Sequence, residues 1–202
     1  MAYTPVATDN FNRADGALGA NWTVAYNGGF LVLGNQARSN GSSNDCCSLY
    51  TGASFANAQY VKATVAQAPT AHYYALGVAT RGNQSGVWRN YCYIGLRDNN
   101  ERYLSRISNG TPTTLQYYNG GGIAVNDIMQ LDSDGSLHSP FRNGTADTSL
   151  GTATDSNYAS GVPGLSGYNG STTATMDDWE GGDITAGGGG TVPLMMLMGI
   201  GS

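Results

Sequence analysis

The carboxylate side chains are the residues of this sequence that could carry hydrolytic chemistry. Hydrolysis of a glycosidic bond needs two carboxylates that flank the bond, one as the acid and the other as the nucleophile or base. The chain has only two glutamates, Glu101 and Glu180, far apart in sequence. Asp132 and Asp134 would share one face of a strand, but we prefer to interpret them as the flank of a turn. We predict that the protein is not an enzyme.

Other catalytic motifs are missing as well. His72 and His138 stand alone, without the spacing of a zinc site. The residues around Ser166 do not form the five-residue nucleophile elbow. The glycines at 120–122 are followed by no Lys-Ser or Lys-Thr pair, so we interpret them as a turn.

One loop near the middle of the chain mixes aromatic and neutral polar side chains. Sugar-binding surfaces combine an aromatic platform with hydrogen-bonding groups. We therefore predict glycan binding by Trp88, Tyr91 and Asn83, with Trp88 as the platform. A core position at the start of a strand is the alternative for Trp88. Trp22 and Trp179 are more typical of the core.

The composition favours an all-β fold. Only 11% of the 202 residues are charged, compared with roughly 25% in globular proteins. Lys62 is the one lysine, so residues that favour an exposed helix are scarce. The many Val, Thr, Tyr, Asn and Gly residues favour strands and tight turns. A chain of this length suits one sandwich domain.

Short β-rich segments recur along the chain and are separated by turn signals such as Asn109-Gly110. This spacing is typical of a sandwich or barrel. The first two segments are expected to be neighbouring strands. The predicted strands are residues 60–65, 73–80, 90–96, 102–107, 113–118, 127–132, 136–142 and 173–180.

The charge balance argues against a nucleic acid partner. The formal net charge is −5 and the chain has no run of basic residues, so nothing would follow a phosphate backbone. The first ten residues lack a basic segment followed by an apolar stretch, so we expect no Sec-type signal peptide. Either the signal was removed or the protein leaves a cytoplasm in another way.

Three cysteines, Cys46, Cys47 and Cys92, give an odd number. Adjacent cysteines seldom bond to each other because disulfide geometry opposes it. Two interpretations stay open: buried free thiols, or one bridge to Cys92.

Several short motifs occur in the order typical of one family of jelly rolls. Together they span about residues 6–182 and resemble the laminin-G-like, concanavalin A-like lectin and glucanase family found in bacteria and phages. The resemblance implies an antiparallel jelly-roll β-sandwich. The clustered E-x-D-x-x-E strand of the family's glycosidases is missing. The motifs are D-N-F-N-R-A-D-G at 9–16, G-V-A-T-R at 77–81, Y-C-Y at 91–93, L-D-S-D-G at 131–135, N-G-T at 143–145, G-V-P-G-L at 161–165, expected to form a turn, and D-D-W at 177–179.

The resemblance also implies one candidate cofactor. Many relatives hold a structural Ca²⁺ where the first and last strands meet, with oxygen ligands at about 2.3–2.6 Å. Asp9 and Asp177 match those strands. Asp178 is the alternate, because neighbours on a strand point to opposite faces. In the competing interpretation Asp9 caps a turn and Asp178 is merely exposed.

The composition changes after Asp183. We predict a sandwich domain over residues 1–184 and a glycine-rich linker with an apolar docking peptide over 185–202. The apolar stretch is about half of the roughly 20 residues that span a bilayer, so it is not a membrane anchor. It is expected to dock on a neighbouring subunit or, alternatively, to fold back on its own sandwich. The docking residues are Leu194, Met195, Met196, Leu197, Met198 and Ile200.

These features suit a non-enzymatic structural protein of a tailed phage. We expect a virion head decoration, fibre or tail-associated subunit in a homo-oligomeric assembly, with an outward jelly roll that binds surface glycans. The alternative is a secreted or cell-surface carbohydrate-binding module. A glycosidase is the third and weakest hypothesis.

Overall fold

The computed structural model describes residues 1–40, 46–70, 75–84, 90–98, 100–168 and 174–185. Within these ranges the chain forms strands and turns, and it has no helix that could cross a membrane. The larger sheet contains β1 (Ala2–Asp9), β2 (Gly16–Ala17), β4 (Phe30–Leu33), β5 (Gln36–Ser39), β7 (Gln59–Gln67), β12 (Ile128–Asp134), β13 (Leu137–Arg142), β14 (Thr145–Ala146), β15 (Ala153–Thr154) and β17 (Thr175–Thr185). The smaller sheet contains β3 (Trp22–Tyr26), β6 (Cys46–Tyr50), β8 (Ala75–Gln84), β9 (Asn90–Arg97), β10 (Glu101–Ser108), β11 (Thr111–Asn119) and β16 (Val162–Tyr168).

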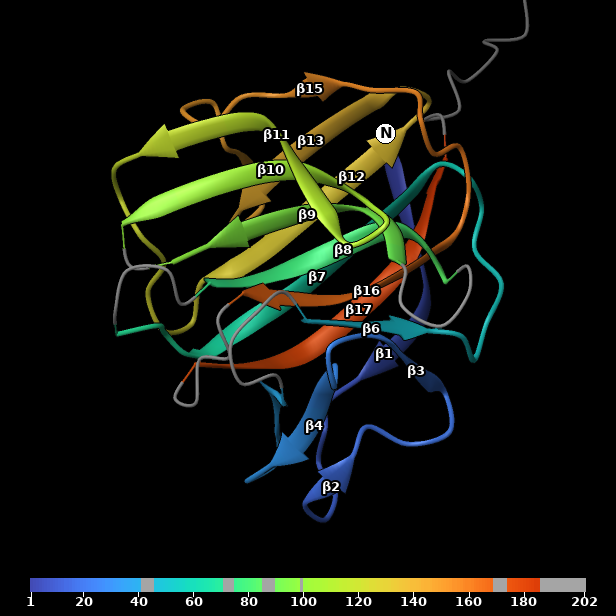
Figure 1. Cartoon of the computed structure of the whole chain (residues 1–202), viewed down its shortest axis with the longest axis vertical. Helices are drawn as coiled ribbons and strands as arrows, with labels where there is room; N and C mark the ends of the chain where they lie inside the picture. The colour runs from blue at the N-terminus through green and yellow to red at the C-terminus, as the bar shows by residue number, and fades with distance from the viewer. Residues whose placement is uncertain (41–45, 71–74, 85–89, 99, 169–173, 186–202) are drawn as a thin grey trace, which may run out of the picture.

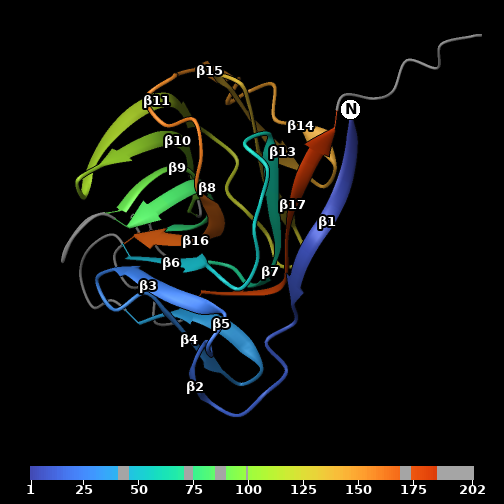
Figure 2. The same ribbon diagram turned by 90° about the vertical axis from the view of Figure 1, so that its right-hand side faces the viewer.

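The two sheets are antiparallel and face each other (Figures 1 and 2). The larger sheet has the order β14-β13-β12-β7-β17-β5-β4-β2, with β1 beside β17 and β15 beside β13. The smaller sheet has the order β11-β10-β9-β8-β16-β6-β3. The first strand pairs with the last described one, and Tyr3 lies opposite Ile184. The predicted all-β jelly-roll sandwich is confirmed.

Two local predictions are wrong. The segments expected to be neighbouring strands became β7 and β8, which lie in opposite sheets. The connection between them is long enough to cross the roughly 10 Å between packed sheets. Residues 161–165 were expected to form a turn, but most of them belong to β16, which lies between β6 and β8.

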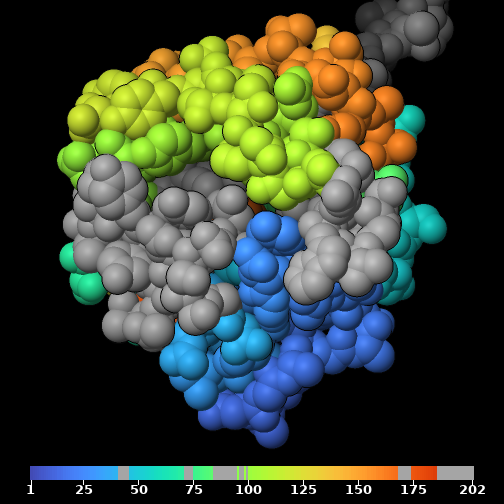
Figure 3. Space-filling model, viewed as in Figure 1, coloured from blue at the N-terminus to red at the C-terminus, as the bar shows by residue number. Residues whose placement is uncertain are grey.

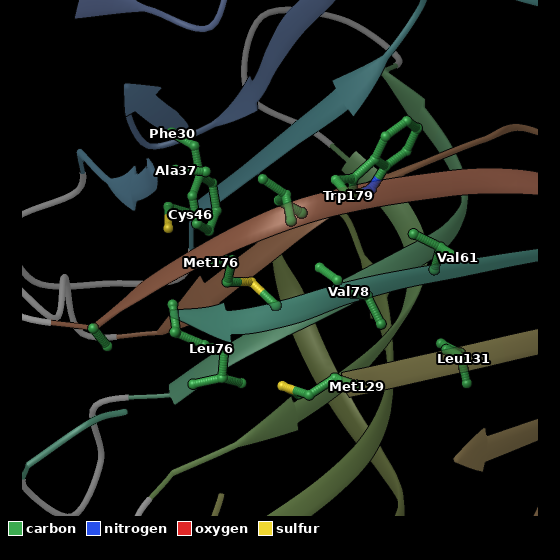
Figure 4. Close-up of a cluster of buried hydrophobic side chains, with 14 of the residues drawn as sticks. Phe30, Ala37, Cys46, Val61, Leu76, Val78, Met129, Leu131, Met176 and Trp179 are labelled. Atoms are coloured by element: carbon green, nitrogen blue, oxygen red, sulfur yellow. The ribbon is translucent and has the colours of Figure 1, made fainter. Parts of the chain in front are cut away.

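The main core lies between the sheets. Val61, Leu131 and Trp179 enter it from the larger sheet, and Leu76 and Val78 from the smaller one (Figure 4). Each of these side chains is at most 1% exposed. Alternate residues of a strand point to opposite faces, so each strand sends every second side chain into this layer.

The two tryptophans that the sequence assigns to the core are packed together there. The rings of Trp22 and Trp179 meet edge to face with centroids 4.9 Å apart. Tyr50 contacts both rings. These aromatic contacts join β3 and β6 of the smaller sheet to β17 of the larger one.

A second apolar cluster lies on the outer face of the smaller sheet, which is the face turned away from the larger sheet. Cys46 and Cys47 are consecutive buried free thiols, yet Cys46 belongs to the main core and Cys47 to the second cluster. They therefore point to opposite faces of β6. The side chain of Cys92 lies outside the described residues. The second cluster consists of Ala25, Cys47, Leu49, Ala75, Ala79 and Ile107, with Tyr26, Tyr103 and Val162 packed against it.

The smaller sheet curls so that its two edges approach each other. A Cβ atom on Gly110, in the β10–β11 turn, would lie 3.1 Å from Oη of Tyr26 in β3. These strands lie at opposite sides of the sheet order. Figure 3 shows the outer face of the smaller sheet, where the yellow-green atoms of β10 and β11 meet the blue atoms of the first strands. The β10–β11 turn therefore covers part of the outer face.

Candidate functional site

The β8–β9 hairpin carries the three residues predicted to bind a glycan. Asn83 is exposed near the end of β8, and its backbone lies opposite that of Tyr91 in β9. The structure thus brings these two residues together as cross-strand partners. Trp88 and the side chain of Tyr91 lie outside the described residues. The role of this group as a binding site stays a prediction.

Arg81 holds the base of this hairpin in place. Its side chain is buried, its φ is +52°, and it lies in a bulge of β8. The guanidinium donates to the carbonyls of Asn57 at 2.9 and 3.1 Å, Gly135 at 2.6 Å and Tyr158 at 3.0 Å. A buried cation is stable only when its donors are satisfied. Arg81 therefore ties three separate loops to the strand that presents Asn83.

Asp9 is fully engaged by hydrogen bonds. Its carboxylate accepts bonds from the Arg13 guanidinium at 2.7 and 2.8 Å, the Trp22 indole at 2.7 Å and the Phe11 backbone N–H at 2.8 Å. Burial alone would raise the pKa of Asp9, but these donors together hold it below its usual value. The carboxylate caps a turn and anchors Arg13.

Asp177 and Asp178 lie in a bulge of β17. The pairing with β7 jumps from Asp177 to Glu180, and Asp178 has a φ of +47°. A bulge inserts an extra residue and redirects the side chains beside it. Asp177 and Asp178 therefore both point away from the core, whereas simple strand alternation predicts opposite faces.

A shallow pocket of about 450 Å³ lies where β1 meets this bulge. Burial raises the pKa of Asp177, and repulsion from Asp178 and Asp9 adds to the effect. The pocket is lined by Thr8, Asp9, Asn10, Asp178, Trp179 and Glu180.

The predicted calcium pair does not fit a metal ion. A cation beside Asp9 would have to displace the positively charged Arg13 guanidinium from both carboxylate oxygens. If Asp9 stays paired with Arg13, Asp177 is the one carboxylate left of the predicted pair, whereas Ca²⁺ takes six to eight oxygens. Among the described residues, no three His, Cys, Asp or Glu side chains are close enough to hold a metal.

The two glutamates lie in different sheets. Glu180 accepts bonds from the Tyr60 hydroxyl at 2.6 Å and the Lys62 ammonium at 2.9 Å, on the outer face of the larger sheet. Glu101 lies in β10 of the smaller sheet. They therefore cannot flank one glycosidic bond, because the whole thickness of the sandwich separates them.

The Asp132 and Asp134 pair is also unlike a catalytic pair. Asp132 is buried and accepts bonds from the Tyr3 hydroxyl at 2.6 Å and the Gln130 amide at 2.7 Å. Burial raises its pKa. Asp134 is exposed at the end of β12, beside the turn at Gly135. The pair flanks a turn, as the sequence indicates.

His138 belongs to a buried hydrogen-bond chain. Its Nδ1 lies 2.8 Å from the Ser133 hydroxyl, and Nε2 lies 3.0 Å from the Asp155 carbonyl oxygen. Ser133 in turn lies 2.6 Å from the Thr80 hydroxyl of the other sheet. His138 and Ser133 are 0% exposed, so a substrate cannot reach them. These hydrogen bonds therefore stabilise the fold.

A tyrosine pair on β10 and β11 was not expected from the sequence. Tyr103 and Tyr117 lie directly opposite each other, with ring centroids 5.1 Å apart. Both hydroxyls donate to the carboxylate of Glu101. The two strands and their Asn109-Gly110 turn are recognisable in the sequence. A bulge in β11 hides the register that pairs the two rings.

Comparisons with known proteins identify the class of fold. No protein-family model matches the chain, and no curated protein matches its sequence. Among solved structures, the carbohydrate-binding module CBM66 from Bacillus subtilis matches with a TM-score of 0.65 and 16% identity, over 83% of this chain and 98% of that one. A Bacillus subtilis protein of unknown function with a galectin-like fold matches with a TM-score of 0.60 and 10% identity, over 90% and 98%. The carbohydrate recognition domain of Emp47p matches at 0.57 and 10%, over 88% and 94%.

The protein therefore has the jelly-roll fold of lectin-like domains. At such low identity the likeness shows the fold alone. It agrees with the concanavalin-like part of the resemblance, and no family model supports the laminin-G part. The carbohydrate recognition domain of Emp46p in a potassium-bound form is also similar, with a TM-score of 0.56 and 6% identity, over 82% of this chain and 90% of that one.

Proposed function

We propose that this protein is a non-catalytic carbohydrate-binding module. The observation that carries the proposal is the likeness of its sandwich to the CBM66 module, which extends over 98% of that module. The Emp47p neighbour is a carbohydrate recognition domain as well. The separation of the two glutamates into different sheets supports a binding role without hydrolysis.

The proposed binding group is Asn83, Tyr91 and Trp88 on the β8–β9 hairpin. Asn83 is exposed and offers both donors and an acceptor to sugar hydroxyls. The buried Arg81 anchors the strand just before it. A rigid base lowers the entropy lost on binding. Glycan binding fits a protein that acts outside the cell or at the cell surface.

The proposal is tested by screening the protein on a glycan array and measuring hits by calorimetry. We expect Trp88→Ala to lower affinity about tenfold, because one stacked ring contributes about 1 kcal/mol. Asn83→Ala should weaken binding to a smaller extent. Val125→Ala, at a residue that is 52% exposed in a loop, is the control and should bind like the wild type. A wild-type protein that binds no glycan contradicts the proposal.

The finer hypothesis of a phage virion subunit stays a prediction. The apolar tail is one of the features that suggest it, and residues 186–202 lie outside the described residues. The similar solved structures support the carbohydrate-binding alternative more directly. Docking by Leu194 to Met198 and Ile200, on a shell subunit or on a second copy of this chain, is likewise untested.

A further inference from the structure

A second group of residues on the smaller sheet has the chemistry of a sugar subsite. Tyr103 and Tyr117 form a cross-strand pair whose ring planes meet at 40°. Tyr117 is 48% exposed, and Tyr103 is half-buried against the second apolar cluster. One ring is therefore held against the sheet, while the other is partly exposed to solvent. Together they make a firm aromatic surface on the outer face of the sheet.

Glu101 sets the direction of the hydrogen bonds in this pair. Its carboxylate is buried and accepts the hydroxyl protons of Tyr117, at 2.5 Å, and of Tyr103. A phenol has one proton to donate. Because both protons are directed to Glu101, the two phenol oxygens can offer only acceptor lone pairs to a ligand. A ligand at this surface must bring the donors.

The edge of the group adds neutral polar side chains. Asn100 donates from its amide to Asn119 at 2.8 Å, and both residues are exposed. Asn119 lies opposite Glu101 in the β10–β11 pairing. Two amides therefore border the aromatic surface on the side of the buried carboxylate. Amides can both donate and accept, which suits a ring with several hydroxyl groups.

The charge of the group selects among hydroxyl-bearing ligands. The Glu101 carboxylate lies directly behind the phenols, and Asp98, also buried, accepts the backbone N–H of Glu101. The whole chain carries a net charge of −5. A carboxylated or sulfated sugar would be repelled, because like charges brought together cost free energy. The fitting ligand is a neutral saccharide.

We propose that Tyr103, Tyr117 and Glu101 form a second subsite that binds neutral saccharides. It lies near the end of β9 that is farther from the β8–β9 hairpin. The proposal depends on the glycan-binding function proposed above. Asn83 pairs with Tyr91 at one end of β9, and Leu96, opposite Tyr103, lies near the other. Positions 91 and 96 are five residues apart in β9, and an odd separation places their partners Asn83 and Tyr103 on opposite faces of a regular strand, so the second subsite would bind a saccharide independently of the hairpin.

The test measures the affinity of the neutral oligosaccharide found on the array for four variants. Tyr117→Ala removes the ring and should weaken binding about tenfold. Tyr117→Phe keeps the ring and the packing, and its loss of one acceptor should weaken binding about threefold. Glu101→Gln frees one phenol proton and should also weaken binding. Leu137→Ala, at a side chain that is 39% exposed on the larger sheet, is the control and should leave the affinity unchanged.

The outcomes separate this proposal from the broader one. Glycan binding that is lost in Trp88→Ala but unchanged in both Tyr117 variants overturns the second subsite alone. A protein that binds no array glycan contradicts the proposed function. The subsite is then tested directly with methyl glycosides of neutral hexoses, followed through the tyrosine ring signals in NMR spectra. Unshifted Tyr103 and Tyr117 signals, or equal shifts with uronic acids, would overturn it.

Discussion

Asp9 illustrates how a single residue acquires its role from its immediate partners. The resemblance to the lectin and glucanase family implies that Asp9 is a metal ligand. The residues that follow it supply the Phe11 N–H two positions later and the Arg13 guanidinium four positions later. An aspartate that bonds a backbone N–H two residues on forms a local turn. The competing interpretation of Asp9 as a turn cap therefore describes the structure.

Replacing Asp9 with Asn should destabilise the protein by about 2–3 kcal/mol. The amide would direct N–H donors at Arg13 or Trp22, which are themselves donors. Urea unfolding should show the same loss in calcium and in EDTA. Asp178→Asn is the control, since Asp178 is exposed with a φ that Asn tolerates. A loss that occurs only in calcium would restore the metal hypothesis.

At the scale of the element, β-bulges decide which residues meet. The Asn109-Gly110 turn pairs Ser108 with Thr111, and an uninterrupted ladder from there would place Gln116 opposite Tyr103. The register shifts between Leu104 and Ser105, so Tyr117 takes that position. A shift of one residue moves a side chain to the other face of a strand. The bulge thus creates the tyrosine pair.

Close packing around β16 makes Gly164 a second element-scale test. A Cβ atom there would lie 2.1 Å from the backbone oxygen of Ser48 and 2.9 Å from Cα of Leu49 in the adjacent β6. Gly164→Ala should therefore cost about 3 kcal/mol or prevent folding, because the strands must separate. Gly95→Ala, in β9, is the matched control, since its nearest contact would be at 3.9 Å. Equal thermal unfolding of the two variants would contradict this account.

At the scale of the whole molecule, polar groups as well as apolar ones join the sheets. The hydroxyl of Thr80, in β8, lies 2.6 Å from that of Ser133, in β12, and Ser133 in turn bonds His138. This series of hydrogen bonds ends at the carbonyl oxygen of Asp155. Each member of the chain is satisfied, as buried polar groups require. Nε2 faces a carbonyl oxygen and therefore donates, and in the neutral ring Nδ1 is then the acceptor for the Ser133 hydroxyl.

The burial of His138 makes stability depend on pH. Burial lowers the pKa of His138 below 6.5, and the nearby Arg81 guanidinium lowers it further, although Asp155 opposes the shift. The unfolded chain therefore binds a proton that the folded one excludes, and stability falls as the pH drops below 6.5. The slope should reach about 1.4 kcal/mol per pH unit. His138→Gln should remove this slope between pH 6.5 and the folded-state pKa in urea unfolding. The same slope in both proteins would refute the assignment.

The sequence by itself determined the all-β fold class. Scarce lysine and glutamate excluded exposed helices, and recurrent Asn-Gly and Asp-Gly turns divided the middle of the chain into strands close to those observed. Trp22 and Trp179 were recognisable as core residues. These features depend on local preferences, which composition and spacing record directly.

Only the tertiary structure decided which side chains share a site. The sequence placed β7 beside β8, but a connection does not reveal which sheet the next strand joins. It paired Asp9 with Asp177, but it could not show that Arg13 already occupies the carboxylate. It did not show the Tyr103–Tyr117 pair, because one extra residue in β11 sets that register. Such contacts depend on long-range pairing and on bulges, whose free energies arise from neighbours distant in the sequence.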